Sequence, residues 1–416
     1  MTRRSILFGA VFLLILAGIG WLFLSPGSSD EPRESPFPET AFVETLEDAA
    51  PGERFWVYGL GAPDFVDGRA YLFDIEGKRL GQISTGYWHT NLLPLYVRDE
   101  IVSVETYFSR GTRGERTDVV VAYDTTTLKP LYEVVIPSKR MMGITNNFLV
   151  SSTQDERFLA VTNYTPAQTL TIVDLESKAF VEEVETPGCM IPHAGGERSF
   201  FLICSNGAFM HIKLGPDGAV QSVERTPVLF DAIEDPLTAA PSKIGDTWYF
   251  MTREANVRAF TVSDDAITAR DEWSLLTDSE RSSGWTIAGF GHSAAHEKTG
   301  RFYALVRQGE PHQFEDPGEE VWVFDTETQK RIQRITMKDF TISIDVTQTD
   351  EPKLLTQDVH IPLSFLEQMR IFASQGQRGF DGLTQARVNV YDATSGDHIV
   401  RSEIAPSGSY LNVKAW

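Results

Sequence analysis

A short β-hairpin pattern recurs along most of the chain, and this repetition constrains the fold more than any other feature. Residues 119–123 (VVVAY) are β-branched and aromatic, residues 124–129 have the Asp/Thr-rich composition of a tight turn, and residues 131–136 form a second apolar run. Two such runs around a short polar segment predict a β-hairpin. Matching aspartates occur fifty residues before and after this copy, at Asp74 and Asp174.

Seven copies of this hairpin can be counted. Their first runs are residues 70–74, 120–124, 170–174, 209–214, 257–262, 321–325 and 388–392. Periods of forty to fifty residues made of short strands and polar turns are typical of β-propellers, in which each copy would supply two of the four strands of a blade. Residues 51–416 give about 52 residues per copy. The sequence therefore predicts an all-β, seven-bladed β-propeller.

The two ends of this repeat region predict how the ring closes. Propellers usually pair a strand from one terminus with strands from the other, which removes an exposed sheet edge. Residues 55–58 precede the first copy and residues 410–413 follow the last, so we expect both to lie in one blade. The repeated aspartates are interpreted as turn residues whose carboxylates accept backbone N–H groups, in preference to catalytic carboxylates.

The N-terminus carries an export signal. Arg3 and Arg4 precede residues 5–24, which contain no charge, and this length just spans a bilayer core with the start left in the cytoplasm. Residues 1–24 are therefore interpreted as a signal peptide or a membrane anchor, with both alternatives open. Residues 25–50, rich in Pro, Ser and acidic residues, are expected to form a linker or arm.

Composition excludes several classes of function. The chain has 416 residues, 42% of them hydrophobic, and a formal net charge of -21, which indicates a folded protein that would repel phosphate backbones and anionic lipids. Its two cysteines, Cys189 and Cys204, are too few for a structural zinc site or an iron–sulfur cluster without other ligands. A disulfide suits an oxidising compartment, and two reduced buried thiols are the alternative.

Two segments depart from the strand pattern. Residues 354–375 lengthen the spacing between the last two copies, and their apolar positions fit a short amphipathic helix. This insertion is interpreted either as a cover for a blade edge or as a partner-docking element. Residues 277–280 (TDSE) form a capping box, which predicts one helical turn before Trp285.

Motifs of catalysis are missing from the sequence. It contains no glycine-rich phosphate loop, no G-x-S-x-G serine motif, no C-x-x-C-H haem site and no C-x-x-C pair. His292 and His296 have the spacing of a zinc pair on a helix, but residues 289–300 favour a strand and turn. Packing or interface hydrogen bonding is therefore the preferred interpretation of these two histidines.

Four segments in register carry a family resemblance. FSRGTRGERTDVVVAYDTTTL, PGCMIPHAGGERSFFLICSNGAFMHIKLG, WSLLTDSERSSGW and EEVWVFDTETQKRIQRI together resemble the large (heavy, beta) subunit of the tryptophan tryptophylquinone amine dehydrogenases. The similarity extends over most of residues 51–416. Residues 137–143 (PSKRMMG) and the cysteine segment look closer to the aromatic (aralkyl) amine dehydrogenases than to the methylamine enzymes.

The resemblance implies a function without catalytic residues in this chain. It implies a periplasmic propeller that assembles with a cysteine-rich small subunit as a heterotetramer of two large and two small chains. In this family the small subunit carries the tryptophan tryptophylquinone and the catalytic base, so no cofactor or metal is expected here. The complex oxidises primary amines to aldehyde and ammonia and passes electrons to a blue copper protein or a cytochrome.

The same resemblance directs attention to particular residues. It places a disulfide between Cys189 and Cys204. Tyr87 and Trp88 occupy the place where the methylamine members have an aromatic residue at the substrate channel, although core packing is the commoner role of such a pair. A charged cluster before residues 119–123 is interpreted as the partner interface or as a solvated loop. Its members are Arg110, Arg113, Glu115, Arg116 and Asp118.

Two other classes of function remain alternatives. One is a stand-alone membrane-tethered β-propeller that serves as a binding scaffold. The other is a propeller hydrolase with a central metal, which would need convergent Asp, Asn, His or Glu ligands in the central channel. A periplasmic location is expected for the chain, with residues 5–24 either cleaved or anchoring it to the inner membrane.

Overall fold

The computed structural model describes residues 45–47, 49–60, 67–143, 147–310, 316–363, 367, 369–371, 374, 385–405 and 409–416. Leu46–Trp416 form one compact unit. The predicted signal peptide or anchor, residues 1–24, and nearly all of the predicted linker lie outside the described residues. Within the described residues no helix has the length and apolar character needed to cross a membrane.

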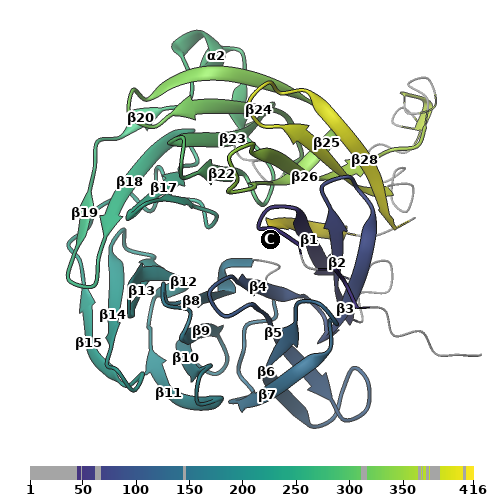
Figure 1. Cartoon of the computed structure of the whole chain (residues 1–416). Coiled ribbons are helices and arrows are strands. Elements are labelled where there is room, and N and C mark those ends of the chain that lie inside the picture. Colours follow the sequence, from purple (N-terminus) through teal and green to yellow (C-terminus); the bar gives the residue numbers. More distant parts are fainter. Residues whose placement is uncertain are drawn as a thin grey trace, which may run out of the picture. The chain divides into compact units, whose positions relative to one another are not determined.

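Antiparallel strands build this unit as six hydrogen-bonded sheets arranged around a common centre (Figure 1). The first sheet has the order β29, β1, β2, β3, with bounds Ser409–Ala415, Arg54–Leu60, Asp67–Asp74 and Arg79–Tyr87. The second consists of β4 (Asn91–Leu95), β5 (Glu100–Phe108), β6 (Arg116–Asp124) and β7 (Pro130–Ile136). The third consists of β8 (Val150–Ser152), β9 (Phe158–Asn163), β10 (Thr169–Asp174) and β11 (Ala179–Glu185).

The remaining sheets follow in chain order. The fourth consists of β12 (Cys189–Gly196), β13 (Ser199–Cys204), β14 (Phe209–Leu214) and β15 (Val220–Arg225). The fifth consists of β16 (Ser242–Ile244), β17 (Thr247–Met251), β18 (Asn256–Val262), β19 (Ile267–Ala269) and β20 (Trp273–Ser274). The sixth has eight strands, namely β21 (Trp285–Ile287), β22 (Ser293–His296), β23 (Arg301–Gln308), β24 (Gly318–Asp325), β25 (Lys330–Val346), β26 (Lys353–His360), β27 (Gln385–Asp392) and β28 (His398–Ala405).

This sheet count corrects the prediction of seven blades. In the part of the chain that the structure describes, five sheets stand as separate blades of four or five strands, and the last two hairpin copies share the eight-stranded sheet. The physical reason is β25, which runs for 17 residues without a break. Its first part pairs with β24, as in Val321↔Ile335, and its last part pairs with β26, as in Ile344↔Thr356. Spacing along the sequence shows where hairpins lie but not whether a strand continues from one into the next.

The predicted closure between the chain ends is confirmed. Strand β1 pairs on one side with β2 and on the other with β29, in a register that places Val57 opposite Val413. The Trp416 N–H also donates to the Arg54 carbonyl at 2.9 Å. Because β1 has a partner on both sides, the start of the repeat region leaves no open edge for another chain to pair with.

The repeated aspartates act as turn residues, as predicted. The Asp124 carboxylate accepts the Thr126 and Thr127 backbone N–H groups at 3.1 and 2.6 Å, and both hydroxyls as well. Hydrogen bonds from Thr127 and Thr126 lower the pKa of Asp124 to about 2. Asp325 and Asp392 accept turn N–H groups in the same way.

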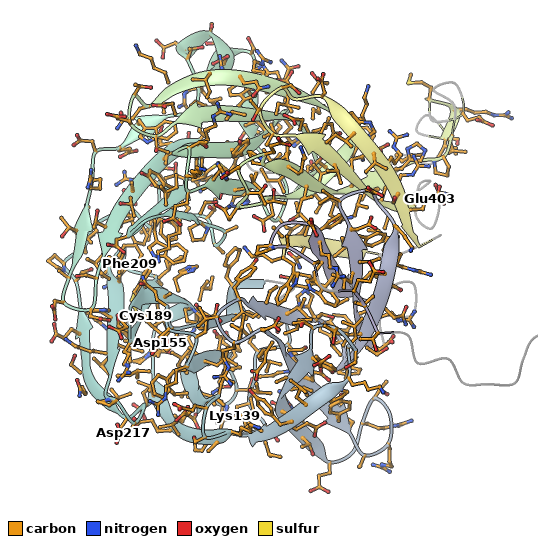
Figure 2. The ribbon with its side chains drawn as sticks, in the orientation of Figure 1. Lys139, Asp155, Cys189, Phe209, Asp217 and Glu403 are labelled. Carbon is orange, nitrogen blue, oxygen red and sulfur yellow. A yellow bond between two sulfur atoms is a disulfide. The ribbon has the colours of Figure 1, made fainter. Side chains whose placement is uncertain are left out.

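The hydrophobic core lies between neighbouring sheets. Val104 and Val120 of the second sheet pack in one buried cluster with Val161 and Val173 of the third. In the fourth sheet Phe209, labelled in Figure 2, packs edge-to-face against the Phe260 ring of the fifth sheet, with 4.8 Å between the ring centroids. Each sheet therefore buries both faces against its neighbours, which fixes the positions of the strands that line the centre.

Helical structure is sparse in the described residues. The predicted turn is present as α2 (Asp278–Ser282), where the Thr277 side chain accepts from the Glu280 N–H and the capping box is complete. A 3₁₀ turn, η1 (Asn147–Leu149), precedes β8. In the predicted insertion 354–375, residues up to 360 belong to β26, while residues 367, 369–371 and 374 are helical.

The predicted disulfide is present and supplies a test of the fold. Cys189 and Cys204 lie directly opposite each other on β12 and β13 and are bonded. Replacing both by alanine should lower the free energy of unfolding by about 3 kcal/mol, because a crosslink across a loop of 15 residues restricts the unfolded chain. Urea unfolding of the double variant measures this, with the exposed Ser205→Ala as the matched control. A loss below about 1 kcal/mol would contradict the prediction.

Candidate functional site

The predicted channel residues Tyr87 and Trp88 lie where the chain passes from the last strand of the first sheet to β4 of the second. Their rings are 6.3 Å apart, and the Tyr87 ring packs edge-to-face on Phe108 at 5.2 Å. Both are half-buried. Trp88 has a φ of 73°, a left-handed conformation that is uncommon for a bulky residue and costs backbone energy. The structure therefore brings this aromatic pair to the base of the predicted charged loop.

The charged loop joins β5 to β6. Arg110, Arg113 and Glu115 are exposed there. The loop has its own hydrogen bonds, because the Arg110 N–H donates to the Arg113 carbonyl at 3.0 Å and the Glu115 N–H to the Ser109 hydroxyl at 3.0 Å. These three charged side chains therefore face solvent from a loop whose backbone is fixed by its own hydrogen bonds.

Arg116 and Asp118 belong instead to a buried network. The Arg116 guanidinium donates to both Asp118 oxygens, from Nε at 2.8 Å and from Nη2 at 2.7 Å. Asp118 is 0% exposed and also accepts the Thr106 hydroxyl at 2.7 Å and the Arg140 N–H at 3.0 Å. With its charge paired and its oxygens satisfied, Asp118 holds the two strands and the following loop in one geometry.

Arg140 is the central residue of this network that the sequence did not single out. Its guanidinium donates to Thr106 Oγ1, to Asn91 Oδ1 at 3.3 Å and to the Tyr87 carbonyl at 3.2 Å. Burial lowers the pKa of Arg140 to about 10, although the Asp118 charge opposes that shift. In the sequence, Arg140 stands out only as part of PSKRMMG, a segment that carries the family resemblance. Through the Tyr87 carbonyl, Arg140 fixes the backbone of the aromatic pair.

Two further titratable groups lie in the same region. Burial raises the pKa of Glu105, whose carboxylate accepts the hydroxyls of Tyr107 and, at 2.6 Å, Tyr123. Burial and the Arg140 charge lower the pKa of His89 to about 3, so its ring is neutral. The network therefore combines positive and negative groups that compensate one another below the surface.

His292 and His296 each form hydrogen bonds within the protein. His296 accepts or donates to Thr299 Oγ1 at 2.8 Å and the Thr349 carbonyl at 3.0 Å, and His292 contacts the Gly289 carbonyl at 3.1 Å. These intramolecular bonds agree with the packing interpretation. Among the residues that the structure describes, no group of three or more His, Cys, Asp or Glu side chains is placed to hold a metal ion.

The described part of the site has paired charges below its surface and unpaired charges above it. Its buried charges are internally paired, and its exposed part consists of charged loop residues beside half-buried aromatic rings. Such a surface can hold a partner in register while it presents an apolar wall. The assigned roles of Tyr87, Trp88, Arg110, Arg113 and Glu115 as channel and interface residues stay predictions.

Comparison with known proteins identifies the family. The model of the methylamine dehydrogenase heavy chain (MADH) family matches residues 56–367. The methylamine dehydrogenase heavy chain of Methylobacillus flagellatus is 26% identical over 315 residues, covering 74% of this chain and 78% of that protein. The heavy chain of Paracoccus versutus is 27% identical over 352 residues, covering 80% of this chain and 77% of that protein.

Solved structures show a likeness of fold alone. A protein of unknown function from Desulfotomaculum acetoxidans matches with a TM-score of 0.53 at 10% identity, covering 87% of this chain and 99% of that one. A putative 6-phosphogluconolactonase from Bacteroides uniformis matches with a TM-score of 0.52 at 12% identity, covering 90% and 99%. At these identities neither activity is transferred to this chain.

The buried network predicts a large effect of one substitution. Among the described residues, Asp118→Asn removes the carboxylate that accepts hydrogen bonds from the Arg116 guanidinium, and it leaves Arg140 with Glu105 as its remaining countercharge. We expect the free energy of unfolding to fall by about 3 to 5 kcal/mol, as when one partner of a buried ion pair is removed. Urea unfolding measures the loss. Glu115→Gln in the exposed loop is the control and should change stability by no more than about 0.5 kcal/mol; equal effects of both substitutions would contradict this account.

Proposed function

Because the chain belongs to the methylamine dehydrogenase heavy chain family, we propose that it is the large, non-catalytic subunit of a periplasmic quinoprotein amine dehydrogenase. The complex would oxidise primary amines to aldehyde and ammonia. The observation that carries the proposal is the family match across residues 56–367, supported by relatives that are themselves heavy chains.

The catalytic chemistry is assigned to a partner. We place the tryptophan tryptophylquinone and the catalytic base on a cysteine-rich small subunit, in an assembly of two large and two small chains. The quinone would accept electrons from the amine and pass them to a blue copper protein or a cytochrome. In this chain, the buried network around Asp118 and Arg140 satisfies its own charges, which suits a structural role in such a complex.

The large subunit would position the small one through the β5–β6 loop. Arg110, Arg113 and Glu115 project from a loop whose base is anchored by the Arg116–Asp118 pair at 2.7 Å. A rigid base lowers the entropy lost when a partner binds, and charged rim residues set register and association rate more than affinity. The Arg116 guanidinium donates to both Asp118 oxygens, and its interface role stays a prediction.

The aromatic pair would shape the substrate channel. Tyr87 and Trp88 lie next to the loop, and Arg140 holds the Tyr87 backbone. An aromatic wall of fixed position can sort amines by the size of the group beside the amino carbon. A preference for aromatic (aralkyl) amines over methylamine is part of the proposal, resting on residues 137–143 and the cysteine segment. Both the periplasmic location and membrane anchoring by residues 5–24 are proposed from the N-terminal sequence.

Loss of the loop charges should weaken assembly without unfolding the chain. In a co-expression with the cysteine-rich small chain, Arg110→Glu/Arg113→Glu should lower the apparent association constant about tenfold or more, since it reverses exposed charges at the contact. Affinity copurification and quantitative titration of the separated chains measure the change. Lys129→Glu, at the other end of β6, is the matched control and should assemble normally.

The same experiment distinguishes the alternatives. Failure of the unmodified chains to copurify, together with absence of quinone absorbance in the small chain, would contradict the amine dehydrogenase proposal and leave the stand-alone scaffold. Unchanged assembly of the double variant would instead reject the loop as the contact while retaining the activity.

Trp88→Ala should change substrate selection. Shortening the wall is expected to raise kcat/KM for a bulky arylalkylamine relative to methylamine by about tenfold, the size that a hydrophobic pocket contributes to discrimination. Steady-state kinetics of the assembled complex with both amines measures the ratio. Phe180→Ala, an exposed aromatic on β11, is the control. A ratio unchanged within twofold would argue that Trp88 serves packing alone.

A further inference from the structure

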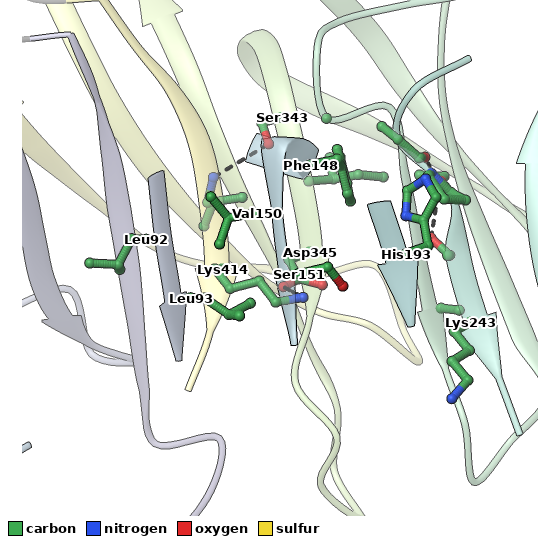
Figure 3. Close-up of a pocket in the computed structure, with 18 of the residues that line it drawn as sticks. Leu92, Leu93, Phe148, Val150, Ser151, His193, Lys243, Ser343, Asp345 and Lys414 are labelled. Carbon is green, nitrogen blue, oxygen red and sulfur yellow. Dashed lines mark hydrogen bonds and ion pairs between the residues drawn. The ribbon is translucent and has the colours of Figure 1, made fainter. Parts of the chain in front are cut away.

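A cavity of about 300 Å³ lies at the centre of the ring, and its lining does not include Tyr87, Trp88 or the described residues of the charged loop. Residues from all six sheets line it, because strands nearest the centre converge there (Figures 1 and 3). Most of its wall is apolar, with Leu92, Phe148, Val150 and Trp248 among the contributors. A concave, mostly apolar site with a few polar groups is the usual form of a small-molecule pocket.

Three charged side chains line this cavity, and two of them pair with each other. Lys414 Nζ lies 3.3 Å from Asp345 Oδ2, and that carboxylate raises the pKa of Lys414. Asp345 also accepts the Ala415 N–H at 3.0 Å and the Val346 N–H at 2.9 Å. The carboxylate is therefore neutralised by groups of the protein itself.

Lys243 is the third charged residue that lines the cavity. It comes from β16, is half-buried, and makes no ion pair within 4.0 Å with any residue that the structure describes. Burial lowers the pKa of Lys243, and the more distant Asp246 and Glu297 only partly oppose the shift. A desolvated ammonium without a contacting anion is unfavourable, so an anion that entered the cavity would be stabilised there. The cavity thus carries a positive excess in a chain of net charge -21.

The wall beside Lys243 is aromatic. Trp248 lies opposite Lys243 in the β16–β17 pairing, with the ammonium 5.8 Å from its ring centroid. Trp248 Nε1 donates to the Ala194 carbonyl at 3.2 Å, which fixes the ring. His193 packs 5.1 Å from Trp248 and 5.7 Å from Phe148. His193 is 1% exposed, and its Nε2 atom has no hydrogen-bond partner among the residues that the structure describes.

We propose that this central cavity binds a small aromatic carboxylate, whose carboxylate group pairs with Lys243 while its ring packs against Trp248 and Phe148. The charge of Lys243 selects the anion, the fixed aromatic wall selects a flat apolar body, and the volume limits the ligand to about one ring with a short substituent. A protonated amine does not fit the same arrangement, since Asp345, the one carboxylate among the described lining residues, is already held by Lys414 and two backbone N–H groups. The site is thus distinct from the proposed amine channel and does not depend on the proposed function.

Binding of benzoate to the purified full chain tests the proposal. Isothermal titration calorimetry should show saturable binding of one benzoate per chain, weakened by added salt because an ion pair contributes. Lys243→Gln should weaken binding by about tenfold or more, whereas Lys243→Arg should keep most of it. Lys330→Gln, an exposed lysine on β25, is the matched control and should bind as the unmodified chain does.

Neutral and inorganic probes separate the two parts of the site. Benzamide has the ring without the charge, and inorganic phosphate has the charge without the ring, so each should bind at least about tenfold more weakly than benzoate. Benzoate should also change the fluorescence of the chain, and Trp248→Phe should reduce that change. Absence of saturable benzoate binding, equal binding by Lys243→Gln, or equal binding of benzamide would each overturn the proposal. Thermal unfolding confirms that the Lys243 variants remain folded.

Discussion

Pairing of the first strand with the last is the interaction on which the rest of the structure depends. Strand β29 pairs with β1, which joins the C-terminus to the start of the repeat region. The first sheet also packs against the eight-stranded sheet in a shared core that includes Phe55 and Val388. Closure removes a sheet edge and brings Tyr58 and Lys414 to the central cavity. Both the rigid outer surface and the enclosed centre follow from this one contact between chain ends.

Much of the fold could be predicted because hairpins leave local signals. Local chemistry predicted the aspartate turns and the capping box at Thr277. The family resemblance implied the Cys189–Cys204 bridge, and the usual closure of propellers predicted the β1–β29 pairing. The division into blades could not be predicted in this way. The continuity of β25 depends on its hydrogen bonds to β24 and β26, which no turn residue signals. A repeat count therefore predicts hairpins more securely than it predicts separate sheets.

The site was predicted less completely, for a related reason. Exposed loop charges can be recognised in a sequence, but buried partners come from distant segments. In the sequence, Arg116 and Asp118 fall in one cluster with Arg113, whereas in the structure they belong to a buried network that is completed by Arg140, 22 residues beyond Asp118. The sequence did not predict that Lys243 would lie unpaired among the described residues of a cavity, because this depends on the pairing of Asp345 with Lys414, far away in the chain. Charge balance inside a closed ring is a property of the assembled sheets.

The claim that this chain positions a small subunit through the β5–β6 loop, next to Tyr87 and Trp88, is tested most directly by hydrogen–deuterium exchange. Exchange should be measured for the chain alone and in complex with the cysteine-rich small chain. The account predicts slower exchange at residues 86–90 and 109–115 on complex formation, with no change at the hairpin turn 124–129 at the other end of β6. Protection of that turn, with residues 109–115 unchanged, would contradict the account.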